Sequence, residues 1–442
     1  MQASGQVSVL GAGYLGATHA ACLASLGLRV HAVDVDADRV AMLASGRAPF
    51  HEPGLEALLA DGVSTGRLTF GTDLEVAAEA ADVHFVCVGT PPSADGHLDL
   101  SALWHLVDDL GRRLHHPCLV VGKSTVPVGT AARVRDRLRA VAPAGRGVAV
   151  AWNPEFLREG HGVADSLRPE RLVLGVESRE ADQRLRALYH PLTAAGVPVV
   201  STDLQTAELS KVSANAMLAG RISMVNAFAE VCEVTGADIG DLVTVLGLDS
   251  RIGPDFLSPG LGFGGSCLPK DTRGLVAQGD ELGLPGVARL WRQVDAVNQH
   301  QRERTAALAQ ELLGGRCADR RVTVLGAAFK AGSDDVRDSP ALDVAARLHD
   351  LGARVCVYDP AATAAAQRVL PALDYALDVL TACRDSELVL VLTDWDEFRL
   401  LDPVAVAEVV AVPRVLDGRL LLDPDKWQRA GWRLRALGRA VA

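Results

Sequence analysis

The chain has 442 residues, more than one hydrophobic core usually organises, so two or three domains are expected. Hydrophobic residues make up 49% and charged residues 22%, a balance that excludes an intrinsically disordered chain. The 44 Lys and Arg stand against 55 Asp and Glu, for a formal net charge of −11. This charge argues against a protein that binds nucleic acid or an anionic membrane over a broad surface.

The cysteines and the apolar runs indicate where the protein works. The eight cysteines are scattered, without a CxxC pair or a Cys/His cluster, so neither a disulfide framework nor a metal site is expected. No apolar run reaches the ~20 residues that span a bilayer, and the N-terminus lacks the basic segment of a secretory signal. We therefore expect a cytoplasmic protein that binds no membrane.

The first part of the chain alternates apolar, strand-like runs with amphipathic helical segments. This alternation is typical of βαβ units, in which helices cover both faces of a parallel sheet. The expected strands are 7–12, 29–36, 83–89, 119–125, 148–153, 167–178 and 197–203.

The middle of the chain lacks strand signals. Residues 203–248 predict one long helix followed by a shorter one, with Asp203 as the N-cap and Gly236 as the stop. A loop rich in glycine and proline is expected over residues 249–274. A helical pattern then resumes as far as about residue 313.

A second alternating region begins near residue 320, where VTVLGAA echoes the earlier VSVLGAG. Its expected strands are 320–330, 353–360, 388–398 and 413–419. We predict an α/β fold with two Rossmann-like doubly wound domains joined by a long central helix. The predicted parts are residues 1–202, 203–315 and 316–442.

The segment GAGYLG follows the first expected strand and opens a helix. Its glycines allow a tight turn and close approach of a pyrophosphate to the helix N-terminus, while an acid at the end of the next strand accepts from a ribose hydroxyl. That acid also repels a 2′-phosphate, which favours NAD over NADP. The predicted cofactor-binding residues are Gly11, Gly13, Tyr14, Leu15, Gly16 and Asp34.

One cysteine lies in the loop of residues 251–271, which is rich in glycine and proline. Such a loop suits a backbone that approaches a ligand closely. Lys270 and Asp271 follow Cys267 by three and four residues, and a nearby ammonium would stabilise the thiolate. Cys267 is therefore a candidate nucleophile, and the alternative is a buried structural thiol.

Lys211 and Asn215 are four residues apart and share one face of the long predicted helix. A cation and an amide donor together stabilise a developing oxyanion, whereas the alternative is a solvated surface pair. Two further loops, residues 123–130 and 153–160, follow strands and carry polar groups suited to water or a sugar. Taken singly, each also fits an ordinary loop.

Together these segments resemble the UDP-glucose/GDP-mannose dehydrogenase family. The resemblance runs nearly from end to end through eight ordered motifs: GAGYLG, FVCVGTPP, KSTVPVGT, NPEFLREG, ELSKVSANAMLA, FGGSCLPKD, LGAAFKAGSDDVRDSP and LDGR. It implies an NAD-binding first domain, a central helical region that forms a homodimer, and a UDP-sugar-binding last domain.

The resemblance also implies a reaction. Enzymes of this family oxidise C6 of a UDP-sugar from alcohol to carboxylate with two NAD+, which for UDP-glucose gives UDP-glucuronate. Cys267 matches the nucleophile that forms a thiohemiacetal and then a thioester, and Lys211 and Asn215 match the groups that stabilise oxyanions. Asp271 matches a base or a water-orienting group beside the cysteine. The implied water-binding pair is Thr125 and Glu159.

The remaining expected contacts come from the same resemblance. The implied substrate-binding residues are Glu155, Phe156, Leu157, Arg251, Lys330 and Arg419, with Arg251 reaching the sugar site of the partner subunit. Thr90 and Arg337 match further contacts to NAD.

Three other functions stay open. The same chemistry fits UDP-N-acetyl-mannosamine, UDP-N-acetylglucosamine or GDP-mannose as the sugar. A simple two-electron dehydrogenase would leave Cys267 structural and yield one NADH per substrate. A dinucleotide-binding regulatory or scaffold protein would lack the nucleophile, the lysine or the carboxylates, and all of these are present.

Overall fold

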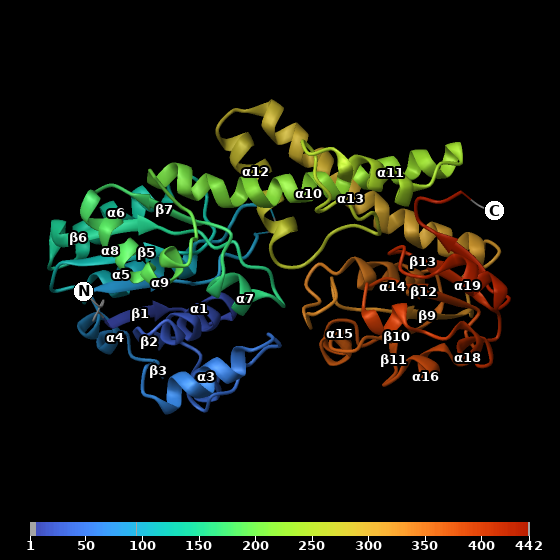
Figure 1. Ribbon diagram of the computed structural model, residues 1–442, viewed down its shortest axis with the longest axis horizontal. Coiled ribbons are helices and arrows are strands. Elements are labelled where there is room, and N and C mark those ends of the chain that lie inside the picture. The colour runs from blue at the N-terminus through green and yellow to red at the C-terminus, as the bar shows by residue number, and fades with distance from the viewer. Residues whose placement is uncertain (1–5, 94, 441–442) are drawn as a thin grey trace. The chain divides into compact units, whose positions relative to one another are not determined.

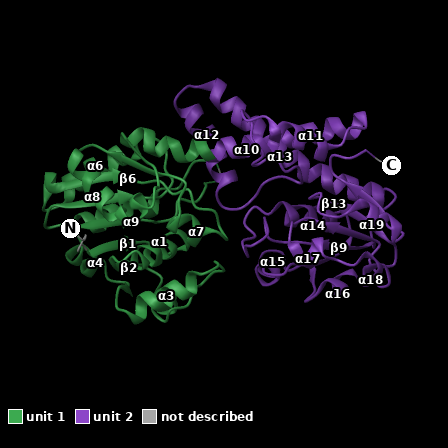
Figure 2. Cartoon of the chain, in the orientation of Figure 1, with its two compact units in different colours: residues 1–214 green, residues 215–442 purple. Residues whose placement is uncertain are grey.

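Figure 1 shows the computed structural model of the chain, which describes residues 6–93 and 95–440. The chain divides into two compact units, Met1–Ala214 and Asn215–Ala442, coloured separately in Figure 2. Helix α10 (Leu204–Thr235) runs through this division, so residues of both units belong to one continuous helix.

The first unit is built on an eight-stranded sheet of order β3-β2-β1-β4-β5-β6-β7-β8. All neighbours are parallel except β6 and β7, which pair antiparallel. The strands are β1 (Gln6–Leu10), β2 (Arg29–Val33), β3 (Leu68–Gly71), β4 (Val83–Val86), β5 (Cys118–Gly122), β6 (Val148–Trp152), β7 (Leu172–Val176) and β8 (Val199–Thr202). The expected strands therefore exist, while the short β3 carries too little apolar signal to be predicted.

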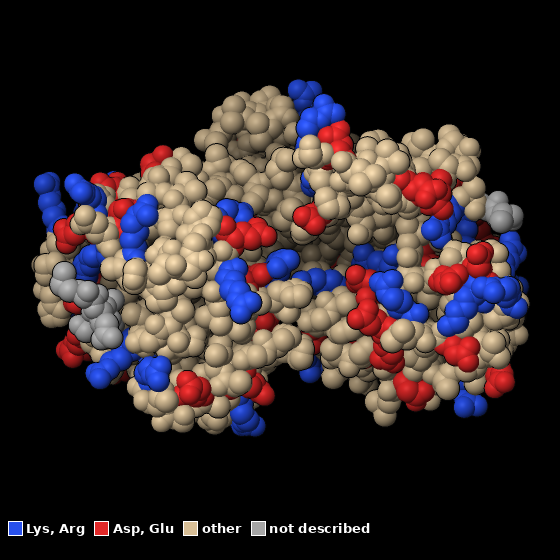
Figure 3. Space-filling view, in the orientation of Figure 1, with Lys and Arg blue, Asp and Glu red and all other residues tan. Residues whose placement is uncertain are grey.

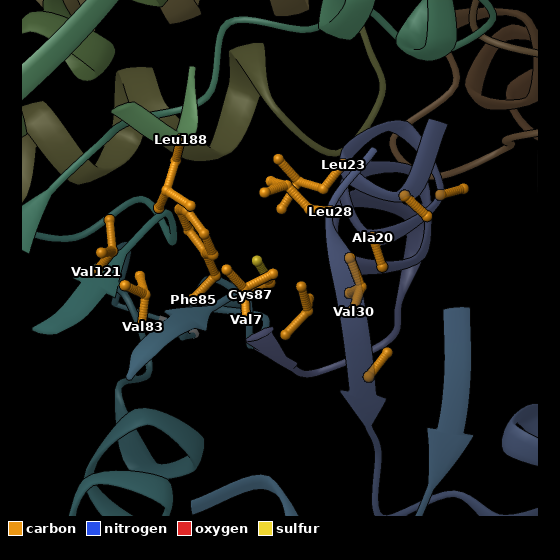
Figure 4. Close-up of a cluster of buried hydrophobic side chains, with 14 of the residues drawn as sticks. Val7, Ala20, Leu23, Leu28, Val30, Val83, Phe85, Cys87, Val121 and Leu188 are labelled. Atoms are coloured by element: carbon orange, nitrogen blue, oxygen red, sulfur yellow. The ribbon is translucent and has the colours of Figure 1, made fainter. Parts of the chain in front are cut away.

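Helices cover both faces of this sheet. They are α1 (Tyr14–Ser25), α2 (Ala37–Ala44), α3 (Leu55–Ser64), α4 (Leu74–Ala80), α5 (Ser101–Gly111), α6 (Thr130–Val141), α7 (Gly162–Leu167), α8 (Arg179–Leu188) and α9 (His190–Ala194), with a 3-10 turn at Gly145–Gly147. On one face, side chains of α1 pack on Val7 and Phe85 in the cluster drawn in Figure 4. Side chains of α4, α5 and α6 pack on the other face. The two cores explain why the strands read as continuous apolar runs.

The predicted long helix and its shorter successor are both present. Asp203 caps α10 by accepting from the amide of Thr206 at 2.7 Å, and Gly236 ends it with a φ of 83°. Helix α11 (Ile239–Leu248) follows. The predicted loop of residues 249–274 extends too far, because α12 (Leu268–Glu281) begins directly after Cys267. Pro269 is tolerated there, since a proline in the first turn loses no helical hydrogen bond.

The second unit contains α13 (Pro285–Leu312) and a six-stranded parallel sheet. Its order, β11-β10-β9-β12-β13-β14, repeats that of the first six strands of the other sheet. The strands are β9 (Arg321–Leu325), β10 (Arg354–Tyr358), β11 (Asp374–Tyr375), β12 (Leu388–Val391), β13 (Arg414–Asp417) and β14 (Arg433–Ala436). The predicted α/β class, with two doubly wound domains and a long central helix, is confirmed.

The helices of this second sheet are α14 (Pro340–Asp350), α15 (Thr363–Val369), α16 (Val379–Cys383), α17 (Asp396–Arg399), α18 (Pro403–Ala407) and α19 (Pro424–Arg429). The turn after β9 differs from its counterpart after β1. The carboxylate of Asp359 accepts from the amides of Ala327 and Ala328 and from the indole of Trp395 at 2.8–3.0 Å. This turn therefore offers its amides to the protein rather than to a dinucleotide.

Positive and negative side chains are intermixed over the face shown in Figure 3, so the net negative charge forms no single patch on that face. Within residues 6–93 and 95–440, no helix is both long and apolar enough to cross a bilayer.

Acid is expected to destabilise the first unit through a buried histidine. Burial, with a smaller contribution from Arg184, lowers the pKa of His84 to about 4, and its ring meets Ser8 at 2.7 Å. The ring is neutral in the folded chain but binds a proton below about pH 6.5 when unfolded. Stability therefore falls as the pH drops from about 6.5 toward 4, with a slope of up to about 1.4 kcal/mol per pH unit from this ring.

Denaturant unfolding at several pH values measures this slope. His84→Gln is expected to flatten it, whereas His116→Gln, at an exposed position, should leave it unchanged. Equal slopes for the wild type and His84→Gln would contradict the assignment.

Candidate functional site

The polar loops of the first unit follow neighbouring strands. The GAGYLG turn follows β1, Thr90 lies after β4, Lys123 follows β5, and the segment 153–160 follows β6. These four strands are adjacent and parallel, so their carboxyl ends meet at one edge of the sheet. Open α/β sheets bind their ligands at this edge, where the strand order reverses.

The turn after β1 is shaped for a dinucleotide. Gly11 has a φ of 93°, and a Cβ on Gly16 would lie 1.7 Å from the Gly11 carbonyl oxygen, so both positions require glycine. A Cβ on Gly13, by contrast, would meet no atom within 4 Å, which leaves its backbone open to a ligand. Asp34 is buried and accepts from the Ala12 amide at 2.6 Å. The residues present therefore fit NAD.

The side chains of Tyr14 and Leu15 make contacts within the protein. The Tyr14 hydroxyl donates to the carboxylate of Glu52, which also accepts from the amide of Gly160 at 2.9 Å. Burial and Glu52, with a smaller contribution from Glu159, raise the pKa of Tyr14, which keeps the phenol protonated. The Leu15 side chain packs on the core. Their side chains therefore fix the turn, and only their backbone groups remain for a cofactor.

Thr90 and Thr125 lie side by side. The Thr90 hydroxyl, which is buried, donates to the carbonyl oxygen of Thr125 at 2.7 Å. A predicted cofactor contact and a predicted water-binding residue are thus adjacent.

Helix α10 is tied to the loop that carries Thr125. Glu208, buried on α10, accepts from the amides of Gly129 at 2.7 Å and Ala131 at 2.5 Å. Burial raises the pKa of Glu208 to about 6, against the opposing effect of these amides. Three residues later, Lys211 lies with its ammonium 5.7 Å from the centre of the Phe156 ring. Glu208 was not predicted, because a single acidic residue in a long helix is usually a solvent-exposed side chain.

Lys211 and Asn215 are 8% and 7% exposed, so they are not a solvated surface pair. The Asn215 amide donates to Asp271 Oδ2 at 2.6 Å, and the other Asp271 oxygen lies 2.8 Å from the Lys270 ammonium. The structure therefore joins two predicted residues that are 56 positions apart in the chain.

Cys267 is exposed and occupies the N-cap position of α12, with its sulfur 3.5 Å from the Ser266 hydroxyl. The alternative of a buried structural thiol is therefore excluded. Asp271 lies one helical turn away and donates its amide to the Cys267 carbonyl oxygen at 2.9 Å. Lys270, three residues after Cys267, pairs with Asp271.

The glycines before Cys267 are explained by neighbouring segments of the protein. A Cβ on Gly262 would lie 2.4 Å from Asn298 Oδ1, and one on Gly264 would lie 2.3 Å from the Asp338 carbonyl oxygen. Gly265 has a φ of 81°, and a Cβ on it would lie 2.8 Å from the Phe329 ring. The loop therefore needs glycine to fit against its own chain.

Two buried side chains of α13 hold this loop. Asn298 accepts from the Phe263 amide at 2.7 Å and donates to its carbonyl oxygen at 3.0 Å. Arg302 donates to the same carbonyl oxygen at 2.8 Å and to Asp338 Oδ1 at 2.6 Å. Sequence reasoning missed both, because they lie in a polar helical stretch about 30 residues downstream that resembles a solvated face.

The predicted cations of the second unit have different surroundings. Arg337 pairs with Asp335. The carbonyl oxygen of Arg337 accepts from the Gly265 amide at 2.9 Å, which places Arg337 beside the loop that ends at Cys267, called the cysteine loop below. The Lys330 ammonium lies 5.6 Å from the Phe329 ring centre.

Arg419 donates to the Leu392 carbonyl oxygen at 2.9 Å and lies beside Gly260. The Arg251 side chain is 88% exposed and pairs with Asp249.

Comparison with known proteins agrees with this geometry. Family profiles match three successive parts of the chain: the NAD binding domain of the UDP-glucose/GDP-mannose dehydrogenase family at residues 5–193, its central domain at 205–300 and its UDP binding domain at 323–424. The chain belongs to this family. Membership confirms the predicted NAD-dependent oxidoreductase with NAD as its cofactor.

Individual relatives extend over nearly the whole chain. The UDP-glucose 6-dehydrogenase of Rhizobium meliloti is 39% identical over 437 residues, covering 98% of this chain and 99% of its own. The UDP-glucose 6-dehydrogenase AglM of Haloferax volcanii is 41% identical, covering 94% and 97%. The solved UDP-glucose dehydrogenase of Pyrobaculum islandicum superposes with a TM-score of 0.90 at 36% identity, covering 98% and 99%.

The close fit of the cysteine loop yields a stability prediction. Gly264→Ala would drive a methyl group into the Asp338 carbonyl oxygen, so it is expected to destabilise the second unit by about 1–3 kcal/mol. The control is Gly286→Ala in the first turn of α13, where a Cβ meets nothing within 4 Å. Denaturant midpoints measure both changes, and equal midpoints would contradict the packing argument.

Proposed function

We propose that this protein is a UDP-glucose 6-dehydrogenase, which oxidises C6 of UDP-glucose to the carboxylate of UDP-glucuronate and reduces two NAD+. One observation carries the proposal: Cys267 is the exposed cysteine, one helical turn from the Asp271 that binds Asn215. Relatives named UDP-glucose 6-dehydrogenase, at 39% and 41% identity, support UDP-glucose as the sugar.

The cysteine allows two oxidations at one carbon. NAD+, when bound, supplies the hydride acceptor for both. After the first oxidation, the Cys267 sulfur adds to the aldehyde carbon and gives a thiohemiacetal. The second oxidation leaves a thioester, and water then releases the carboxylate and restores the thiol. The start of α12, where the helix dipole favours negative charge, suits an attacking thiolate.

Lys211 and Asn215 suit the stabilisation of the oxyanions in these steps. An asparagine amide carries two hydrogens, and the bond to Asp271 uses one of them. The second can donate to an oxygen of the substrate. Because α10 carries both residues one turn apart, the ammonium and the amide share a face of the helix.

The remaining roles follow the same proposal. Thr125 and Glu159 bind the hydrolytic water, and Asp271 orients the reacting group beside Cys267. UDP-sugar contacts come from Glu155, Phe156, Leu157, Lys330 and Arg419, and NAD contacts come from Gly11, Gly13, Tyr14, Leu15, Gly16, Asp34, Thr90 and Arg337. The division into parts 1–202, 203–315 and 316–442 and the cytoplasmic location belong to the proposal too.

The proposed enzyme is a homodimer, with Arg251 reaching the sugar site of the partner subunit. Helix α10 supports this arrangement, because it exposes an apolar stripe at helical spacing: Met217, Met224, Phe228 and Val231, which are 40–62% exposed. Such a stripe on a soluble chain is usually covered by another surface. The 88% exposure of Arg251 is consistent with a group that acts outside its own subunit.

Another nucleotide sugar is the second candidate. The solved UDP-D-ManNAc dehydrogenase of Pyrococcus horikoshii covers 98% of this chain with a TM-score of 0.86, but at 25% identity. The higher identity to the proteins named for UDP-glucose favours glucose.

NADH released per UDP-glucose consumed, with limiting sugar and excess NAD+, tests the reaction. The wild type should release two. Cys267→Ser should lose UDP-glucuronate formation by at least about a thousandfold while binding NAD normally, because only the covalent step is removed. Cys317→Ser, at a buried cysteine away from the loop, should still release two.

One NADH per sugar from the wild type would favour the two-electron dehydrogenase. Normal acid formation by Cys267→Ser would refute the covalent route. Turnover of another nucleotide sugar in place of UDP-glucose would support the second candidate.

Sedimentation equilibrium tests the dimer. The wild type should show twice the mass of one chain, and Met224→Glu with Val231→Glu should shift it toward one chain, because buried carboxylates oppose packing. Leu377→Glu is the control, since Leu377 is 91% exposed and is not part of α10. A single-chain mass for the wild type would contradict the dimer.

A further inference from the structure

Lys123 is a buried cation for which the mechanism above has no use. It directly follows β5, and its side chain is 4% exposed. Its ammonium lies 2.9 Å from Glu155 Oε2 and 3.1 Å from the side-chain oxygen of Asn153. A buried ammonium is costly unless it is paired and hydrogen-bonded, so these partners determine what the residue does.

The pair stays ionised because each charge stabilises the other. Burial opposes the charge on Lys123, but the neighbouring Glu155 carboxylate, together with Tyr189 and Cys87, raises the pKa of the ammonium. Burial likewise disfavours the Glu155 carboxylate, yet Lys123 and, less strongly, Lys211 hold the pKa of that carboxyl below its usual range. The titratable groups facing the pair from the surrounding elements are Lys211, Tyr189, Cys22, Cys87 and His19.

Glu155 also binds the backbone amides of the next two residues. Its Oε1 accepts from the amide of Phe156 at 2.9 Å and from that of Leu157 at 3.0 Å. Two cations lie near the Phe156 ring, with the Arg171 guanidinium 4.1 Å and the Lys211 ammonium 5.7 Å from its centre. An unbroken series of contacts therefore joins Lys123 to Phe156 and its neighbours.

On its other side, Lys123 contacts Asn153, which is itself hydrogen-bonded to neighbouring strands. The backbone amide of Asn153 donates to the Gly122 carbonyl oxygen at 2.8 Å. The side-chain amide of Asn153 donates to the Val173 carbonyl oxygen at 2.9 Å. The Tyr189 hydroxyl donates to the same Asn153 oxygen that Lys123 contacts, at 2.6 Å. Lys123 is thus fixed to the sheet on one side and holds the loop on the other.

We propose that Lys123 is a positioning residue for sugar binding, which fixes residues 156–157 through the Glu155 carboxylate. The inference rests on the proposed function, which assigns UDP-sugar contacts to Glu155, Phe156 and Leu157. Lys123 itself touches no reacting atom. Its effect is to keep Glu155 charged and the loop in one conformation before the sugar arrives, which lowers the entropic cost of binding.

The central variant is Lys123→Met, which keeps the length of the chain and removes the charge. The KM for UDP-glucose should rise at least about tenfold, while the KM for NAD changes by less than about twofold, because the GAGYLG turn is not held by Lys123. Lys426→Met, at an exposed position on α19, is the matched control and should match the wild type.

The pH dependence of the KM for UDP-glucose distinguishes a positioning role of Lys123 from a general loss of structure. Without Lys123, burial raises the pKa of the Glu155 carboxyl, so the charged form is lost as the pH falls. The KM for UDP-glucose of Lys123→Met should therefore rise from about pH 8 to 6, while the wild type stays flat. Lys123→Met combined with Glu155→Gln should abolish this pH dependence, because the glutamine oxygen still accepts from the two amides without a charge.

Hydrogen exchange gives a reading without any substrate. The amides of Phe156 and Leu157 should exchange at least about tenfold faster in Lys123→Met, since their acceptor is no longer held, while the peptide around Asp359 is unchanged. If Lys123→Met does not fold, the double variant, which buries no unpaired charge, carries the test and should show slow exchange and a flat profile.

Unchanged KM and unchanged exchange in a folded Lys123→Met would overturn the proposal, and so would a pH dependence that persists in the double variant. Failure of the wild type to oxidise UDP-glucose would instead reject the proposed function, and the exchange of residues 156–157 would still decide the role of Lys123.

Discussion

Parallel pairing is the constraint on which the first unit depends. Because β1, β4, β5 and β6 run in the same direction, the segments after them end at one edge whatever their separation in sequence. This explains how residues from the GAGYLG turn to the 153–160 loop come to line one region. The antiparallel step between β6 and β7 ends the series just after the last of these loops. The second sheet repeats the strand order, but Asp359 accepts from two amides of the turn after β9, whereas Asp34 accepts from the Ala12 amide in the turn after β1.

The conformation of the cysteine loop depends on a different constraint: several of its positions have no space for a Cβ atom. Three of its glycines lie where a Cβ would meet another segment at less than 3 Å. Asn298 binds both backbone polar groups of Phe263, and Arg302 binds the same carbonyl oxygen. The loop is therefore positioned by tight packing and by buried hydrogen bonds to a helix, while Cys267 itself remains accessible. A reactive group on an otherwise immobilised segment needs little reorganisation to react.

Much of the fold could be predicted from the sequence, because buried parallel strands are read as apolar runs and the GAGYLG glycines have few other uses. The short strands β3 and β11 have no comparable signal. The start of α12 was misplaced because glycine and proline around Cys267 suggested a loop, although Pro269 fits a first helical turn.

For the site, local motifs pointed to Cys267, Lys211, Asn215 and Asp271. The supporting residues Lys123, Glu208, Asn298 and Arg302 are recognised only by their partners. Those partners lie between 30 and 79 residues away, so no local pattern contains them.

The cysteines differ in a way that extends beyond the site. Seven of the eight are buried, and burial raises the pKa of each of these seven thiols. Shielded, protonated thiols react slowly with electrophiles. The folded native chain therefore behaves like an engineered single-cysteine protein. A maleimide dye or a spin label added in equal amount attaches at Cys267, and an oxidant reacts first with the same sulfur.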